Sequence, residues 1–337
     1  MFRFFLASLF LLFYAELLAQ TSTQEINILF YNTENLFDIE DDPTIEDDEF
    51  LPEGDRHWNS YRLRQKLNSL SKVILNCAGF IPPDIVGVCE VENRIVLEQL
   101  LANTPLNRYN YSIIHKDSPD ERGIDVALFF RDDQLTPLTY HYVPILDKNR
   151  QVEETREILY ASFLCAEGQD TLHLFFNHWP SRYRGQAATE EDRMQAAITL
   201  RKEVDRLIAI DSKVKIVIMG DFNDQPRNNS LIKGLQAREN DNLSEHGELL
   251  NLSAGWKQGT IKYRQTWSVF DQIIVSDGLL QAESWNTSYD GASVVSLPFL
   301  FVEDAKYKGR KLFRTYNGFS YQGGFSDHLP ILLKIKK

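Results

Sequence analysis

The sequence predicts an α/β fold built in layers, and three observations support this prediction. Near the N-terminus, two apolar runs at residues 26–31 and 84–89 are separated by a segment with helical spacing. Between residues 111 and 177, strand-like runs follow one another over short connections, as in an antiparallel meander. A helical pattern at residues 189–208 then leads directly into an apolar strand at 214–219. Strands and helices that follow one another in this way are typical of layered α/β folds.

The expected helices have recognisable beginnings. Ser60 can cap a helix that runs to about Asn76, and a shorter helix is expected at residues 94–101. Thr189 can cap the longest helix, which has an acidic first turn. The buried side of that helix is marked by apolar residues at helical spacing: Met194, Ile198, Val204 and Leu207.

The strand at residues 214–219 delivers polar groups at its end. Gly220 follows the apolar run and lets the backbone turn or approach a ligand closely. Asp221, Asn223 and Asp224 come next. A carboxylate that only accepts hydrogen bonds, beside an amide that also donates them, suits a metal-bound phosphate. An Asx-rich turn after a core strand explains the same residues, and this stretch alone does not decide between the two interpretations.

Polar side chains stand at the ends of several other strands too. A lone histidine before Trp-Pro, as at position 178, is more often a structural residue. A carboxylate inside an apolar strand, as at position 271, needs a partner. Strand ends at one edge of layered sheets can nevertheless converge into a single site. The candidate residues are Asn32, Glu90, His178, Asp221, Asn223, Asp271, Asp327 and His328.

These residue types indicate metal and acid–base chemistry. Oxygen ligands such as Asn32, Glu90 and Asp327 suit Mg²⁺ or Mn²⁺, which keep bound waters and bind phosphates. Two histidines beside carboxylates suit general acid–base catalysis near neutral pH. The sequence contains no Cys/His set with the spacing of a structural zinc site and no Walker loop.

Composition is that of a folded protein, with a pronounced acidic balance. The 337 residues are 43% hydrophobic, and the formal net charge of −12 argues against unspecific nucleic-acid binding through a basic surface. A nuclease is not excluded, because bound divalent cations can offset charge locally. The acidic segment at residues 38–55 is expected to be a solvated loop. The alternative is a loop that gates substrate or binds Ca²⁺, although it lacks the ordered spacing of an EF-hand.

The first twenty residues are expected to be a signal peptide, followed by a single domain at residues 21–337. Arg3 provides a short positive region, an apolar run follows, and cleavage is expected near Gln20. An uncleaved anchor is the alternative. Cleavage would place the protein in the periplasm or outside the cell, without a stable membrane span. Its three cysteines are expected to be buried small hydrophobic residues, and their odd number leaves at least one thiol free.

Six short motifs together resemble the endonuclease/exonuclease/phosphatase superfamily, also called the deoxyribonuclease I-like fold. Each motif is weak alone, but the six occur in the family's order from about Ile26 to Ile335. They are Phe-Tyr-Asn at Asn32, Ile-Val-Gly-Val-Cys-Glu at Glu90, Asn-His-Trp-Pro at His178, Gly-Asp-Phe-Asn at Asp221, Phe-Asp-Gln-Ile at Asp271 and Ser-Asp-His-Leu-Pro at Asp327. The resemblance implies a four-layered αββα sandwich, in which two mixed β-sheets pack face to face with helices outside.

The resemblance also implies a role for each site residue. Glu90, Asn32 and Asp327 would hold the divalent metal. His328, oriented by Asp271, would act as general base toward the attacking water. By the same resemblance, His178 would bind the phosphate or act as an acid, and Asp125 would be its acidic partner. Arg156 would contact the phosphate. Asp221 and Asn223 would position water and phosphate.

The expected function is therefore an exported, divalent-metal-dependent phosphoester hydrolase. A nuclease or phosphodiesterase acting on DNA or RNA is the leading interpretation, with Mg²⁺ or Mn²⁺ as cofactor and Ca²⁺ as a further candidate. A phosphatase or a lipid phosphodiesterase similar to sphingomyelinases is the alternative, and a non-catalytic binding protein of the same fold is the third. The chain departs from the family at Glu92, an extra acid just after Glu90. Glu92 would either repel a polyanionic substrate or face solvent.

Overall fold

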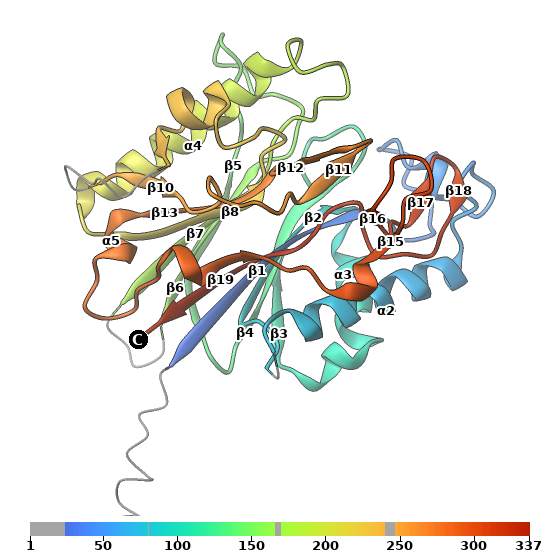
Figure 1. Cartoon of the computed structure of the whole chain (residues 1–337), viewed down its shortest axis with the longest axis horizontal. Coiled ribbons are helices and arrows are strands. Elements are labelled where there is room, and N and C mark those ends of the chain that lie inside the picture. The colour runs from blue at the N-terminus through green and yellow to red at the C-terminus, as the bar shows by residue number, and fades with distance from the viewer. Residues whose placement is uncertain (1–23, 80, 166–169, 240–246) are drawn as a thin grey trace, which may run out of the picture.

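Two large β-sheets packed face to face form the centre of the protein, with helices on their outer sides (Figure 1). The computed structural model describes residues 24–79, 81–165, 170–239 and 247–337. The predicted α/β sandwich is confirmed. The expected signal peptide lies outside the described residues. Within them, no helix combines the length and the apolar character that crossing a bilayer requires.

The first sheet has six strands, and two helices cover its outer face. Its central pair, β1 and β2, is parallel, whereas every other pairing in this sheet is antiparallel. Leucine and valine side chains of α2 (Ser60–Cys77) and α3 (Arg94–Ala102) pack against the sheet. In spatial order the strands are β14 (Ala292–Val294), β19 (Ile331–Lys336), β1 (Glu25–Leu36), β2 (Ile85–Val91), β4 (Asp125–Arg131) and β3 (Tyr111–Ile114).

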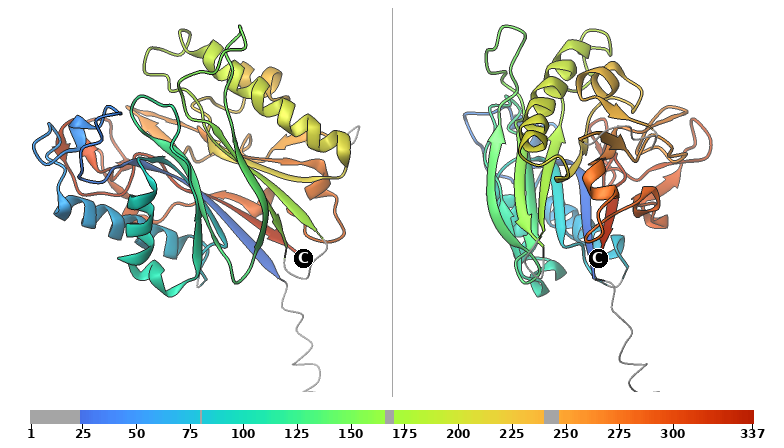
Figure 2. Two further views of the ribbon diagram at one scale, coloured as in Figure 1. Left: turned by 180° about the vertical axis from the view of Figure 1, so that it is seen from behind. Right: turned by 90° about the vertical axis from the view of Figure 1, so that its left-hand side faces the viewer.

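The second sheet has seven strands, and α4 (Glu190–Ile210) crosses its outer face (Figures 1 and 2). Here β7 and β8 are parallel, while β8 and β13 are antiparallel. The spatial order is β5 (Thr136–Val143), β6 (Ile158–Leu164), β7 (Thr171–His178), β8 (Lys215–Asp221), β13 (Asp271–Ser276), β10 (Leu249–Asn251) and β9 (Ala237–Arg238).

Between the sheets lies an apolar core in which aromatic rings meet across the interface. Phe30 of β1 stacks on Phe176 of β7 with ring centroids 6.2 Å apart. Gly87 of β2 permits this contact, because a Cβ at that position would lie 2.3 Å from the Phe176 ring. Burial of such apolar surface contributes about 25 cal/mol per Å² and fixes how the two sheets sit on each other.

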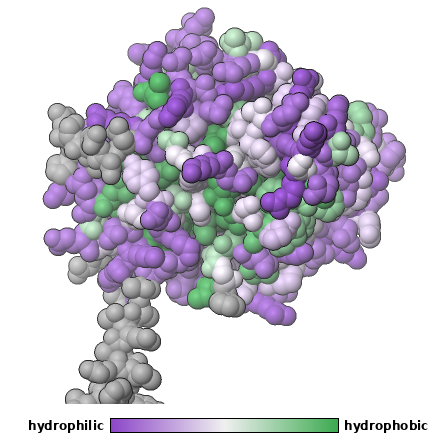
Figure 3. Space-filling model, viewed as in Figure 1, coloured by the Kyte–Doolittle hydropathy of each residue, from purple (hydrophilic) through white to green (hydrophobic). Residues whose placement is uncertain are grey.

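Short elements complete the chain, most of them in the C-terminal third. The small strands and turns form the rim of the molecule, and in the face drawn in Figure 3 hydrophilic residues cover most of the edge. These elements are η1 (Asp48–Phe50), η2 (Pro105–Arg108), η3 (Ser230–Gly234), β11 (Ile261–Tyr263), β12 (Thr266–Ser268), α5 (Asp277–Leu280), η4 (Tyr289–Gly291), η5 (Pro298–Leu300), β15 (Phe301–Glu303), β16 (Arg310–Leu312), β17 (Tyr316–Asn317) and β18 (Ser320–Tyr321).

Several local expectations differ from the structure. The meander is divided between the sheets, because β3 and β4 pair in the first and β5, β6 and β7 pair in the second. Asn59, rather than Ser60, caps α2 by accepting hydrogen bonds from two backbone amides. The buried face of α4 includes Arg193, which forms an ion pair with Asp224 at 2.9 Å, whereas Met194 is only half-buried. Apolar spacing could not show that a paired arginine occupies that face.

The acidic segment at residues 38–55 is folded rather than simply solvated. Phe50 stacks on Phe37 with centroids 4.2 Å apart, and Trp58 donates a hydrogen bond to the Phe37 carbonyl. Asp47 is buried within the segment. Packing against this aromatic cluster therefore orders a loop that composition alone suggested would be exposed.

A side chain larger than hydrogen at Gly220 is predicted to lower the stability of the protein, because two strands meet closely at this position. Gly220 lies within β8, and a Cβ there would be 2.3 Å from the carbonyl oxygen of Asn177 in β7. We expect Gly220→Ala to destabilise the protein by about 1–3 kcal/mol, since the clash is with backbone. Gly255→Ala is the matched control, because a Cβ at Gly255 meets nothing within 4 Å. Equal urea midpoints for the two variants would contradict this account.

Candidate active site

Three candidate residues lie in one row across the second sheet. In the strand register, His178 at the end of β7 pairs with Asp221 at the end of β8, and Asp221 pairs with Asp271 at the start of β13. Parallel β7 and β8 bring their carboxyl ends to one edge, and antiparallel β13 begins at that same edge. Strand register alone therefore gathers residues that are far apart in the sequence.

The first sheet contributes Asn32 and Glu90, and the Asn32 amide joins the two sheets. Its Nδ2 donates hydrogen bonds to Glu90 Oε1 and to Asp221 Oδ2, both at 3.2 Å. Its Oδ1 accepts from the backbone amide of Glu34. One buried side chain thus holds together two carboxylates that come from different sheets.

A β-bulge aims Glu90 into the site. The register between β2 and β4 shifts at this point, and Glu90 has a φ of +59°, which non-glycine residues rarely adopt. The Asn35 backbone amide donates to Glu90 Oε2 at 3.0 Å. Backbone strain is therefore concentrated at a residue whose side chain faces the other candidates.

His328 forms a tight pair with Asp271. The His328 Nδ1 lies 2.7 Å from Asp271 Oδ2, and the Nε2 lies 3.7 Å from Asp221 Oδ2. Burial alone would lower the pKa of His328, but the Asp271 and Asp221 carboxylates outweigh burial and raise it well above its usual range. The Ser326 hydroxyl accepts from the His328 amide and donates to the Asn32 carbonyl, so the pair is fixed to β1.

His178 and Asp221 have opposite electrostatic environments. His178 Nε2 lies 3.9 Å from both Glu90 Oε1 and Asp221 Oδ2. Burial, followed by the nearby Arg156 charge, lowers the pKa of His178 well below its usual value, so its imidazole is neutral. Burial raises the pKa of Asp221 to about 7, although the His328 charge opposes this shift. The site thus contains one neutral and one readily charged imidazole.

Asn223 and Asp224 mainly contact protein groups next to the site and hold them in place. Asn223 has a φ of +48°, its amide donates to Asp221 Oδ1, and its side-chain Nδ2 donates to the Trp179 carbonyl. Asp224 forms ion pairs with Arg182 and Arg193. Glu92 does not face solvent, because it is buried and its Oε2 accepts a hydrogen bond from the Asp38 backbone amide; burial raises its pKa to about 8.

A supporting network that the sequence did not predict surrounds Asp327. Arg314 bridges Asp327 Oδ2 at 2.8 Å and Glu34 Oε1 at 3.0 Å. Lys66 is fully buried and donates to the Phe325 carbonyl at 2.6 Å, and burial lowers its pKa to about 8. Glu34 lies only two residues after Asn32, but its position suggested a turn rather than a site. Nothing local to Lys66 or Arg314 distinguishes them from surface cations.

The expected pairing of Asp125 with His178 requires a correction. Asp125 Oδ2 lies 2.8 Å from His115 Nε2, and its Oδ1 accepts from the Ser118 amide. Both oxygens are therefore committed elsewhere, because β3 places His115 beside the start of β4. His178 Nδ1 has no hydrogen-bond partner among the described residues.

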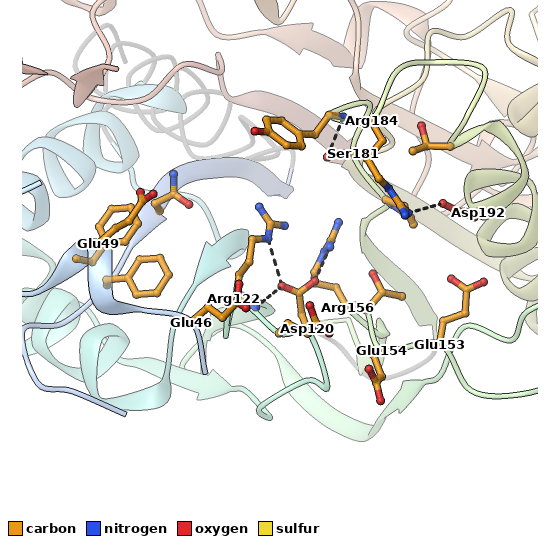
Figure 4. Close-up of a pocket in the computed structure, with 18 of the residues that line it drawn as sticks. Glu46, Glu49, Asp120, Arg122, Glu153, Glu154, Arg156, Ser181, Arg184 and Asp192 are labelled. Carbon is orange, nitrogen blue, oxygen red and sulfur yellow. Dashed lines mark hydrogen bonds and ion pairs between the residues drawn. The ribbon is translucent and has the colours of Figure 1, made fainter. Parts of the chain in front are cut away.

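Arg156 lies at the inner wall of a cleft next to the site (Figure 4). It donates to Asp120 Oδ2 at 2.6 Å and to the Trp179 carbonyl at 2.9 Å, while its Nε has no partner in the described structure. Arg122 lies on the other side of Asp120, with its Nε 3.4 Å from that carboxylate. Two guanidinium groups are thus positioned around one acid.

The cleft has a volume of about 1410 Å³ and an acidic lining. Asn35, whose amide binds Glu90, and Pro180, which follows the Trp179 carbonyl, place the cleft directly beside the candidate residues. Its charged lining comprises eight acids and four arginines: Glu46, Asp48, Glu49, Asp120, Glu121, Glu153, Glu154, Asp192, Arg56, Arg122, Arg156 and Arg184. Such a lining favours ligands that are not long polyanions.

The oxygen-rich centre fits a hard divalent cation. Glu90 and Asp221 are held side by side by one amide, and Asp271 Oδ1 is buried with no hydrogen-bond partner in the described part of the chain. Carboxylate oxygens in such a setting are the usual ligands of Mg²⁺. Asp221, Asp271 and His328 also offer ligand atoms within 4.8 Å of one another. The close His328–Asp271 hydrogen bond leaves those two groups better suited to proton transfer than to ligation.

Asp271 is predicted to control the protonation of His328. In metal-free protein, Asp271→Asn should lower the pKa of His328, because burial continues to disfavour the imidazolium after the raising charge is lost. The measurement is an NMR titration of the His328 ring. The exposed Asp290→Asn change is the control and should leave this titration unaltered. An unchanged His328 titration in Asp271→Asn would show that the pair does not set this pKa.

Comparisons with known proteins give one family and several similar structures. A sequence profile described as Endonuclease/Exonuclease/phosphatase family matches residues 27–337. No match was found among curated proteins. A mannosyl-6-phosphatase from Bacteroides thetaiotaomicron is similar at 15% identity and a TM-score of 0.57, with 92% of this chain and 99% of that chain covered.

Two further solved structures show the same fold. D. rerio TDP2, complexed with a single-strand DNA product, has 14% identity and a TM-score of 0.56, with 93% of this chain and 100% of that chain covered. An endonuclease/exonuclease/phosphatase family protein from Bacteroides thetaiotaomicron has 14% identity and a TM-score of 0.57, covering 94% and 98%. Because the profile spans nearly all of the described residues, the chain belongs to the endonuclease/exonuclease/phosphatase family.

Proposed function

We propose that the protein is a divalent-metal-dependent phosphoester hydrolase, with Mg²⁺ or Mn²⁺ as the working cation. The observation that carries this proposal is the 2.7 Å pair of His328 and Asp271, whose free Nε2 faces Asp221 beside Glu90 and His178. A base, an orienting acid and oxygen ligands suited to a cation thus lie in one largely buried cluster beside the cleft.

Glu90, Asn32 and Asp327 are the residues we assign to the cation. When bound, the cation would supply positive charge against the phosphoryl oxygens and lower the pKa of His328 by repelling its imidazolium. Asn32 presents Nδ2 to the carboxylates and uses Oδ1 for the Glu34 amide. Asn32 would then hold the carboxylates in place through Nδ2 and would ligate the cation through the second lone pair of Oδ1.

The proton-transfer roles follow from the hydrogen bonds. With Nδ1–H donating to Asp271, the neutral His328 has a free Nε2 lone pair that can take a proton from an attacking water. Asp271 then stabilises the imidazolium that forms. Neutral His178 can donate a hydrogen bond from Nε2 to a phosphoryl oxygen. Asp221, close to both rings, would position the water.

The charge of the cleft favours a small phosphoester over nucleic acid. Eight acids against four arginines would repel a long polyanion, whereas Arg122 and Arg156 can receive one phosphate near His178. The remainder of the substrate would then be uncharged or cationic and would lie against the acidic wall. A phosphatase or phosphodiesterase of a small molecule is therefore the interpretation we favour, and a nuclease becomes the second candidate.

A substrate screen tests the proposal directly. The protein would be incubated with p-nitrophenyl phosphate, bis-p-nitrophenyl phosphate, plasmid DNA, RNA and sphingomyelin, each with Mg²⁺ and with EDTA. We expect EDTA-sensitive turnover of a small aryl phosphoester. Turnover of nucleic acid alone would select the second candidate. No metal-dependent turnover of any phosphoester by folded protein would overturn the proposal.

His328 is predicted to be essential for the chemical step. His328→Ala should lower kcat by about 10²- to 10⁴-fold, which is the usual contribution of a general base, and leave the circular dichroism spectrum unchanged. His141→Ala is the control, because His141 lies exposed on β5 of the second sheet. A His328→Ala enzyme with the parent's kcat would remove this residue from the mechanism.

The acidic wall is predicted to exclude polyanions. A Glu153→Lys/Glu154→Lys double variant reverses two charges on the wall of the cleft, away from the proposed catalytic residues. We expect kcat/KM for DNA or RNA to rise by about tenfold or more, with a steeper salt dependence, while kcat for the small phosphoester stays the same. Unchanged discrimination between the two substrate classes would show that these charges do not select the substrate.

Export of the mature chain remains part of the proposal. Its support is the apolar N-terminal segment that begins after Arg3 and ends before Gln20. N-terminal sequencing of protein recovered from the periplasm or medium would show cleavage near Gln20, and an intact Met1 would contradict this prediction.

The described cysteines are all free. Burial raises the pKa of Cys165 to about 11, so that thiol is protonated at neutral pH.

A further inference from the structure

A second group of carboxylates lies outside the proposed catalytic cluster, in the acidic segment at residues 38–55. Asp41, Asp47 and Asp48 each offer an oxygen, and these three oxygens lie within 4.8 Å of one another. They surround the start of η1, where Asp47 is the residue before the helix. None of them belongs to the set that holds His328 or Glu90.

Asp47, a member of this group, has a buried carboxylate oxygen that has no hydrogen-bond partner among the described residues. The residue is 1% exposed, its Oδ2 accepts from the Asp42 amide, and its Oδ1 is buried without a hydrogen-bond partner. Buried carboxylate oxygens in folded proteins are almost always satisfied, because desolvation without compensation is costly. An isolated buried oxygen beside two further carboxylates therefore indicates that something positive binds there.

No basic side chain in the described structure supplies that charge. The nearest arginine along the chain, Arg56, forms its ion pair with Glu49 at 2.9 Å. Neither Asp41 nor Asp48 has an ion-pair partner among the described residues. Three mutually close carboxylates repel one another, and a bound cation would relieve that repulsion.

The loop is held in shape independently of any ion. Phe50 stacks on Phe37, Arg56 lies 4.9 Å over the Phe50 ring, and the Glu46 amide donates to the Glu121 carbonyl at 2.8 Å. These contacts fix both ends of the cluster against the body of the protein. The carboxylates are thus presented on an ordered scaffold, as a specific site requires.

We propose that Asp41, Asp47 and Asp48 bind a Ca²⁺ ion. Calcium takes six to eight oxygen ligands in flexible geometry, so three carboxylates supplemented by backbone carbonyls and water suit it better than they suit Mg²⁺, which demands a near-ideal octahedron. Because Asp48, Glu46 and Glu49 also line the cleft, the ion would fasten that wall and reduce its negative charge.

Calcium binding is predicted to survive loss of the catalytic metal site and to be lost from the loop variants. Isothermal titration with CaCl₂ would use chelator-treated full-length protein carrying Glu90→Gln, so that binding at the catalytic cluster is weakened. In this background we expect one Ca²⁺ site. Adding Asp47→Asn, which preserves side-chain shape, or Asp48→Asn, which changes an exposed residue, should weaken Ca²⁺ binding by about tenfold or more.

The control is Asp55→Asn, which removes an exposed acid from the same segment and should leave Ca²⁺ affinity unchanged. The melting temperature provides a second readout: CaCl₂ should raise it in the Glu90→Gln protein and in the control, but not in Asp47→Asn. Absence of a Ca²⁺ site in Glu90→Gln protein, or equal affinities for Asp47→Asn and Asp55→Asn, would overturn the proposal. Neither result depends on which substrate the enzyme hydrolyses.

Discussion

The amide of Asn32 is the contact on which the site depends. It donates one hydrogen bond to Glu90 from the first sheet and one to Asp221 from the second, both at 3.2 Å. Two ionised carboxylates brought close together away from bulk water repel each other, and at an effective dielectric constant near 20 the repulsion of neighbouring unit charges amounts to a few kcal/mol, about 4 at a separation of about 4 Å. A shared donor offsets part of this cost and sets their spacing. Because Ser326 holds the Asn32 carbonyl and the His328 amide, the same contact also places the imidazole.

The two sheets can deliver these groups only because each strand end is shaped for it. Parallel β7 and β8 approach closely at Gly220, while antiparallel β13 begins opposite Asp221. Glu90 and Asn223 both have positive φ values, at the bulge within β2 and just after the end of β8, so the chain bends sharply at both points. Packing of the sheets around Phe30 and Phe176 maintains these conformations, because the core allows little slippage between the layers. The strain at the site is thus supported by burial elsewhere.

Much of this arrangement could be predicted from the sequence, for a physical reason. An apolar run that ends in a carboxylate, amide or imidazole is a local pattern, and the fold class and the list of candidate residues depended on such patterns. Partner choice depends on contacts that such patterns do not contain. Arg314 joins Glu34 to Asp327 because segments distant in sequence meet there. Asp125 pairs with His115 rather than His178 because β3 and β4 pair antiparallel, and an apolar pattern does not give that pairing. Similarly, an alternating pattern does not say which sheet a strand joins, so the division of the meander between two sheets was not predictable.

Negative charge is common to the proposed catalytic cluster, which lies beside the cleft, and to the acidic loop, whose Glu46, Asp48 and Glu49 line it. In the proposed catalytic cluster His328 can neutralise only one of three carboxylates, the buried Asp221 and Asp271 and the half-buried Glu90. In the loop no basic side chain among the described residues neutralises Asp47. A protein of net charge −12 gains little from adding distant lysines to correct either group, since the Debye length is about 8 Å at physiological ionic strength. Under both proposals, divalent cations would solve the problem locally, because they would bind where the carboxylates already converge. Charge that would destabilise the folded chain by itself would then become the source of its affinity for metal, and hence of the proposed capacity to bind a phosphate beside an acidic wall.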